Sequence, residues 1–128
     1  SGTLPACMSN LTNLYELFMD ANKFHGSIPS SFGNLVQMQQ LDLSSNYLTG
    51  KTPTSLGNMV RMQYLDISDN MLTGTLLSSI GQFKNLTNLY VENNSFIGEF
   101  PPSYSKLHIF CFCFHSVIYI LLFYFFIK

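Results

Sequence analysis

The stretch from Leu41 to Gly50 reads Leu-Asp-Leu-Ser-Ser-Asn-Tyr-Leu-Thr-Gly, and its pattern recurs through most of the chain. Its asparagine, Asn46, is one of four that stand 24 residues apart. Other positions repeat in step with these asparagines. The asparagines are Asn22, Asn46, Asn70 and Asn94. Five residues before them stand Leu17, Leu41, Leu65 and Leu89, and three residues before them stand Met19, Leu43, Ile67 and Val91. Two residues after them stand Phe24, Leu48, Leu72 and Phe96, and four residues after them stand Gly26, Gly50, Gly74 and Gly98. Such a fixed period predicts stacked coils.

The spacing of the apolar residues predicts the fold class. Residues alternate between apolar and polar around each leucine, and a period of two places the apolar side chains on one face of a strand. A period in the twenties with this spacing is typical of leucine-rich repeats. We therefore expect an α/β repeat protein, a leucine-rich repeat right-handed solenoid with a parallel β-sheet on its concave face, followed by a hydrophobic C-terminal helix.

The polar residues of each repeat predict how the coil turns. The asparagine side chain can satisfy backbone groups at the bend after the strand, and the glycine four positions later allows positive φ or a close approach. Pro29, Pro53 and Pro101 then stiffen an extended return segment, whereas Leu77 takes this place in the third copy. A column of serines follows and predicts short helical turns on the convex side: Ser31, Ser55, Ser79 and Ser103.

Composition limits the function classes. The chain has 128 residues, of which 47% are hydrophobic and 10% charged, so there is room for one domain. A net charge of -1 argues against a nucleic-acid partner, which would require a basic stripe. The three cysteines do not make a disulfide framework. The chain opens in mid-repeat, and we therefore expect a fragment.

The repeat period stops at Leu107. We expect two regions: residues 1–107, with a partial first repeat and about four full repeats, and residues 108–128, a hydrophobic transmembrane segment. Ile109 to Ile127 is a run of 19 residues flanked by Lys106 and Lys128, long enough as a helix to cross a bilayer once. The alternative is that the sequence after Leu107 is translated intron or frame-shifted sequence.

The string Leu-Thr-Gly-Lys-Thr-Pro-Thr-Ser-Leu-Gly-Asn-Met, from Leu48 to Met59, resembles the plant-specific extracellular type of leucine-rich repeat. The resemblance covers Ser1 to about Leu107. It implies the ectodomain of a plant receptor-like protein or receptor kinase, which recognises a peptide or protein ligand at the cell surface. It also implies a single-pass protein of the plasma membrane with its repeats outside the cell, and a co-receptor as a further candidate partner.

The outward strand positions are the candidate ligand surface. We assign to it Glu16, Phe18, Asp20, Gln40, Asp42, Ser44, Tyr64, Asp66, Ser68, Asp69, Asn88, Tyr90 and Glu92. Six of the seven acidic residues lie in these columns, while all lysines and arginines lie elsewhere, which favours a basic peptide partner. Phe18, Tyr64 and Tyr90 are candidate anchors. The plainer alternative is that Asp42 and Asp66 only solvate the sheet.

Three sequons mark candidate glycosylation sites at Asn10, Asn85 and Asn93. We expect Asn10 and Asn85 at equivalent bends on the outer side, whereas Asn93 borders the ligand face.

No catalytic motif, cofactor or metal site is predicted. Cys111, Cys113 and His115 form an incomplete metal set, and in a helix Cys113 would point away from the other two. Without a phosphate loop, nucleophile elbow or kinase signature, we expect a binding protein rather than an enzyme. Two alternatives stay open: a soluble cell-wall protein resembling polygalacturonase inhibitors, and a truncated gene product without activity.

Overall fold

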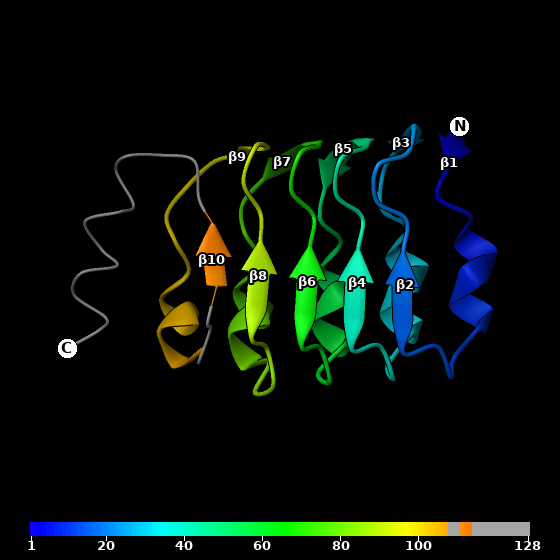
Figure 1. The fold of residues 1–128 in the computed structure, drawn as a ribbon. Coiled ribbons are helices and arrows are strands. Elements are labelled where there is room, and N and C mark those ends of the chain that lie inside the picture. Colours follow the sequence, from blue (N-terminus) through cyan, green and yellow to red (C-terminus); the bar gives the residue numbers. More distant parts are fainter. Residues whose placement is uncertain (108–110, 114–128) are drawn as a thin grey trace.

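A computed structural model describes residues 1–107 and 111–113, and it is a stack of similar coils (Figure 1). Sheet 1 contains strands β2 (Glu16–Phe18), β4 (Gln40–Asp42), β6 (Tyr64–Asp66), β8 (Asn88–Tyr90) and β10 (Cys111–Cys113). Sheet 2 contains β1 (Gly2–Thr3), β3 (Phe24–Gly26), β5 (Tyr47–Lys51), β7 (Met71–Gly74) and β9 (Ser95–Phe96). The 3-10 helices are η1 (Ala6–Asn10), η2 (Ser30–Asn34), η3 (Thr54–Asn58), η4 (Ser78–Gln82) and η5 (Pro102–Lys106).

Sheet 1 confirms the predicted stacking of the strands. Its neighbours are parallel and paired one repeat apart, so that Leu41 lies beside Leu17 and Leu65 beside Leu41. Leu89 continues the row. Side chains on either side of each leucine point outward because strand residues alternate between faces. The four leucines are between 0% and 9% exposed, so this row forms one wall of the core.

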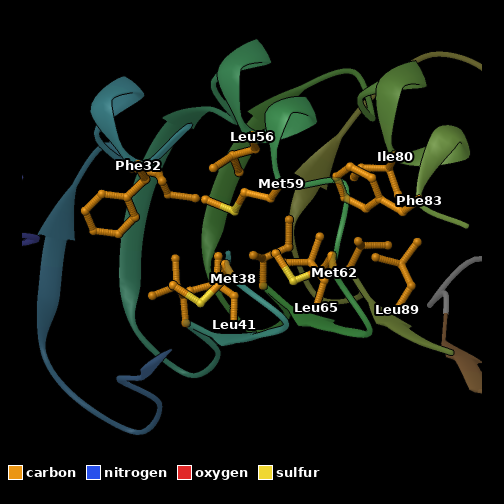
Figure 2. Close-up of a cluster of buried hydrophobic side chains, with 14 of the residues drawn as sticks. Phe32, Met38, Leu41, Leu56, Met59, Met62, Leu65, Ile80, Phe83 and Leu89 are labelled. Atoms are coloured by element: carbon orange, nitrogen blue, oxygen red, sulfur yellow. The ribbon is translucent and has the colours of Figure 1, made fainter. Parts of the chain in front are cut away.

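The core lies between sheet 1 and the 3-10 helices (Figure 2). Its members come from the same position in successive repeats and stack in rows. The rows are Met38, Met62 and Leu86; Phe32, Leu56 and Ile80; and Leu35, Met59 and Phe83. These side chains form one buried cluster that runs through the coils, so burial of any coil depends on its neighbours.

Sheet 2 is a feature that the sequence pattern does not predict. The segment after each asparagine is expected to be a turn leading to an extended return, but it pairs with its neighbours as a second parallel sheet. The pairing is shifted by two residues per coil, since Gly26 lies opposite Leu48 and Gly50 opposite Leu72. Gly26, Gly50, Gly74 and Gly98 have φ between 77° and 86°, which confirms the predicted need for glycine at this position.

The predicted helical turns are present, and they are 3-10 helices rather than α-helices. Gly33, Gly57 and Gly81 allow these turns to approach closely. A methyl group added to Gly33 would lie 2.5 Å from the carbonyl oxygen of Ser55, and one on Gly81 would lie 2.5 Å from Ser103 Cβ. Serine hydroxyls join the same turns, as Ser55 Oγ donates to the Ser30 carbonyl at 2.6 Å.

The C-terminal helix is expected over Ile109 to Ile127, and most of that segment lies outside the described residues. At residues 111–113 the helix prediction is wrong, because this segment is strand β10, paired parallel to β8. Pairing gives the open edge of β8 hydrogen-bond partners that a helix could not supply. Sheet 1 therefore extends past the repeat boundary expected at Leu107. Within the described residues, no helix has the length and hydropathy needed to cross a bilayer.

Candidate functional site

The outward residues of sheet 1 form one continuous polar and aromatic face, which we call the sheet 1 face. Two residues from each strand contribute to it, one on each side of the buried leucine. They are Glu16 and Phe18 on β2, Gln40 and Asp42 on β4, Tyr64 and Asp66 on β6, and Asn88 and Tyr90 on β8. Asp20, Ser44, Ser68 and Glu92 lie just past the strand ends.

Two of the aspartates have a local structural role that is not among the predictions from the sequence. Asp42 Oδ1 accepts hydrogen bonds from the backbone N–H and the hydroxyl of Ser44, at 2.9 and 2.7 Å. Asp66 makes the same pair with Ser68, at 2.9 and 2.6 Å. The signal is an Asp-x-Ser sequence, in which a carboxylate can bond the backbone two residues on. Ser44 and Ser68 are therefore turn-forming residues, and Ser68 is buried.

Tyr64 joins neighbouring aspartates across two strands. Its hydroxyl lies 3.3 Å from Asp66 Oδ2 and 3.5 Å from Asp42 Oδ2. Burial raises the pKa of this hydroxyl, and the negative charges of Asp66 and Asp42 raise it further. Burial also raises the pKa of Asp66, although its hydrogen bonds to Ser68 act in the opposite direction. Both aspartates are half-buried and remain on the open face.

The structure brings together two of the three predicted aromatic anchors. The rings of Tyr64 and Tyr90 are tilted by 50° with their centroids 5.7 Å apart, and Asn88 Nδ2 donates to the Tyr90 hydroxyl at 3.3 Å. Phe18 lies on β2, separated from β6 by the whole of β4. It is 53% exposed. The candidate site is therefore centred on β4, β6 and β8.

The acidic residues after the strand ends lie in tight turns. Asp69 has φ of 51°, as do its equivalents Ala21, Ser45 and Asn93 within one degree. Asn93 Nδ2 donates to Asp69 Oδ1 at 2.7 Å, which joins two adjacent coils. Glu92 Oε2 is buried and has no hydrogen-bond partner among the described residues. Burial raises the pKa of this carboxyl.

The first coil holds the remaining predicted residues. Gln40 Nε2 donates to Glu16 Oε1 at 3.0 Å, which ties the exposed Glu16 side chain to β4. Asp20 is exposed in the turn after β2. These residues extend the negative charge of the sheet 1 face toward the N-terminal edge of the stack.

The asparagine side chains of the column bond backbone groups. Asn70 Nδ2 donates to the carbonyls of Leu43, Ile67 and Ser68, and its Oδ1 accepts the Leu48 N–H at 2.9 Å. Asn46 and Asn94 repeat this arrangement, each reaching back to the preceding coil. Each of these side chains thereby joins two parts of the preceding coil, the residue after its sheet 1 strand and its sheet 2 strand. Within the described residues, Asn22 Nδ2 donates to carbonyls of its own turn, at Met19 and Asp20.

The three sequons lie in different surroundings. Asn10 is the last residue of η1 and Asn85 lies between η4 and β8, and both are exposed. They occupy different points on the coil, so the expectation of equivalent bends is wrong: their separation is not a multiple of the repeat. Asn93 is exposed but its amide nitrogen is bonded to Asp69.

The titratable groups of the sheet 1 face are carboxyls and phenols, and most of them take part in hydrogen bonds. Among the residues whose side chains the structure describes, no three His, Cys, Asp or Glu groups converge as metal ligands would.

The fold and its asparagine column define the class. The family profile named Leucine rich repeat matches residues 12–72 and 41–96, which together are more than half of the chain. The protein belongs to the leucine-rich repeat family. Proteins of this fold are interaction scaffolds and are not typically catalytic.

Several of the similar solved structures are plant proteins. The ectodomain of the Arabidopsis thaliana membrane receptor kinase GASSHO1/SCHENGEN3 matches with a TM-score of 0.87 and 34% identity, over 90% of this chain and 14% of that one. The SOBIR1 ectodomain from the same species matches with a TM-score of 0.78 and 31% identity, over 86% and 61%. A plant ice-binding protein matches with a TM-score of 0.82 and 26% identity, over 90% and 39%.

The chain spans less than two thirds of the length of each of these three structures. No curated protein matches it. The three similar structures include receptor kinases and an ice-binding protein, so the shared fold does not define one ligand. The ligand must be argued from the residues of this chain.

Proposed function

We propose that this protein is a non-catalytic recognition module of the plant extracellular leucine-rich repeat type, and that its sheet 1 face binds a basic peptide segment. The observation that carries the proposal is the charge of that face. Six of the seven acidic residues lie on it or at the turns that border it. The ligand of a similar structure supports a peptide or protein partner, since the GASSHO1/SCHENGEN3 ectodomain was solved in complex with CASPARIAN STRIP INTEGRITY FACTOR 2.

In the described part of the chain the positive charges lie outside the outward strand positions. Lys23 lies between β2 and β3, and Lys106 ends η5. Lys51 ends a strand of sheet 2, while Arg61 and Lys84 lie in the segments between a 3-10 helix and the next sheet 1 strand. Like charges concentrated on one surface raise the local potential and attract ligands of opposite sign. We therefore expect the affinity for a basic peptide to fall as the salt concentration rises.

The second part of the proposal concerns location. We propose that the repeats face the outside of a plant cell, with glycans on Asn10 and Asn85. Both asparagines are exposed and lie outside the strands of sheet 1. Asn93 differs, because the nitrogen that would carry the glycan donates a hydrogen bond to Asp69 Oδ1.

The test measures binding of a labelled peptide of alternating basic residues and glycine, with arginine and lysine in equal number, by fluorescence anisotropy. The variant D20N/D66N/E92Q removes three negative charges, and the amide oxygen that replaces the Asp66 carboxylate can still accept the hydrogen bonds of Ser68. We expect affinity to fall about tenfold or more. The control is Glu99→Gln, which removes an exposed charge outside the face. Unchanged affinity in the triple variant, or an equal loss in the control, would contradict the proposal.

A further inference from the structure

Within the sheet 1 face, four side chains form a cluster with a distinctive combination of chemistry. We call Asp42, Tyr64, Asp66 and Tyr90 the tyrosine–aspartate cluster. It spans the three adjacent strands β4, β6 and β8, in which Asp42 pairs with Asp66 and Asp66 with Tyr90. All four side chains are half-buried, so each is held in place yet reachable from solvent. The two rings and the two carboxylates therefore present one combined surface.

The carboxylates of the cluster have more acceptor capacity than the cluster itself can satisfy. Both Oδ1 atoms accept hydrogen bonds from Ser44 or Ser68. Both Oδ2 atoms lie within hydrogen-bonding reach of the same Tyr64 hydroxyl, which carries one proton. That proton can make a strong hydrogen bond to Asp42 or to Asp66, but not to both at once. A hydrogen-bond donor of a ligand on the open face would supply a partner for the carboxylate that does not receive the Tyr64 proton.

The tyrosine rings add a second requirement on the ligand. An aromatic face attracts a cation placed within about 6 Å of its centre. A planar cation can also stack on the ring while its edge donates hydrogen bonds to neighbouring groups. The guanidinium of arginine is planar, permanently charged and carries five N–H donors, whereas the ammonium of lysine is a compact point charge that can use only part of this surface.

We propose that the tyrosine–aspartate cluster is a subsite for one arginine side chain of the ligand. The guanidinium lies against the Tyr90 ring and donates hydrogen bonds to the Oδ2 atoms of Asp42 and Asp66. This inference rests on the proposed function, because it assigns the chemistry of one position within the basic segment. It makes arginine, rather than positive charge alone, the feature that the face selects.

The test compares three labelled peptides that differ only in the residue alternating with glycine: arginine, lysine or citrulline. Citrulline keeps the planar shape of arginine but has no charge. For the unmodified chain we expect arginine to bind about fivefold more tightly than lysine, and citrulline to bind more weakly than either. This comparison needs no variant, so it does not depend on a substituted chain folding correctly.

Substitutions in the chain then show which residues cause the preference for arginine over lysine. In Tyr90→Leu and in Asp42→Asn we expect the arginine-to-lysine affinity ratio to fall to about one, because the first removes the ring and the second removes a charged acceptor. The amide oxygen introduced by Asp42→Asn can still accept the Ser44 hydrogen bonds. Tyr64→Phe keeps its ring and removes the competing donor, so its ratio should stay at the unmodified value or rise. The matched control is Tyr47→Leu, an exposed tyrosine on sheet 2, which should leave the ratio unchanged.

Two outcomes would overturn the inference in distinguishable ways. Equal binding of the arginine and lysine peptides by the unmodified chain would contradict the arginine subsite without contradicting the basic-peptide function. A ratio that is high in the unmodified chain and unaltered in Tyr90→Leu and Asp42→Asn would place the preference elsewhere. Binding of none of the peptides would contradict the proposed function itself.

Discussion

At the scale of single residues, the asparagine column explains how short strands can stack. Strands of two to five residues have few ladder hydrogen bonds of their own. Each inner asparagine adds donors and an acceptor aimed at the preceding coil, in a place where water cannot reach all of them. Buried backbone groups left without partners cost on the order of 1–3 kcal/mol each. The side chain therefore stabilises the joint between two coils as well as its own turn.

Comparison of two members of the column tests this role. Asn70→Ala leaves the Leu43 carbonyl and the Leu48 N–H without their partner, and we expect it to lower the free energy of unfolding by about 3 kcal/mol. Asn22→Ala removes two exposed bonds within one turn, and its loss should be about 1 kcal/mol or less. Urea unfolding followed by circular dichroism measures both. Equal losses would show that contacts to the preceding coil do not matter.

Glu92 gives a prediction about pH. Burial raises its pKa, so the folded chain retains a proton that the unfolded chain releases. Its favourable contribution is present below the unfolded pKa of about 4.5 and is lost as the pH rises through the higher folded value. Glu92→Gln is neutral at every pH. We expect this variant to unfold at a higher urea concentration than the unmodified chain near neutral pH, with the difference vanishing well below pH 4.5.

The same titration series on Glu99→Gln serves as the control, because Glu99 is exposed on another surface. A stability difference in Glu92→Gln that stays constant with pH would mean that the charge of Glu92 is fully solvated in the folded chain.

At the scale of elements, the 3-10 helices depend on glycine for their spacing. Gly81→Ala would place a methyl group 2.6 Å from the carbonyl oxygen of Ser103, and the backbone of η5 must move to admit it. We expect a loss of about 1–3 kcal/mol in unfolding free energy. Asn58→Ala changes an exposed residue of η3 and should alter stability by less than about 0.5 kcal/mol. A Gly81→Ala variant as stable as Asn58→Ala would contradict the close approach.

The two sheets differ in how far the sequence could predict them. The strands of sheet 1 were predictable because Leu41 and its equivalents alternate with polar neighbours and repeat without error. Sheet 2 was not, because its segments contain or closely precede the glycine column and most are followed by a proline, and both residue types favour turns. Its pairing also joins residues two positions out of step with the repeat, as at Gly26 and Leu48.

The candidate site was predictable in outline but not in detail. Alternation along each strand predicted that Tyr64, Asp66 and Tyr90 point outward. Sequence alone could not show that the Tyr64 hydroxyl reaches both Asp42 and Asp66, since this depends on side-chain conformation. Phe18 shares a repeat column with Asp66 and Tyr90 and lies beside Asp42, but β4 separates it from the strands that carry the two tyrosines.

At the scale of the whole molecule, the stack separates stability from recognition. Residues pointing inward from sheet 1 form rows that bury one coil against the next. Residues pointing outward are not needed for these rows, so they can carry charge and aromatic side chains chosen for a ligand. The acidic surface results from this division, because six carboxylates lie on the strands of sheet 1 or in the segments directly after them.

The most direct test of the central claim is nuclear magnetic resonance with the mixed arginine and lysine peptide titrated into the isotope-labelled chain. We predict that the amide signals of Asp42, Tyr64, Asp66 and Tyr90 shift in proportion to the peptide bound, while those of Tyr47 and Met71 on sheet 2 stay in place. Shifts confined to sheet 2, or a spectrum that the peptide leaves unchanged, would contradict the account.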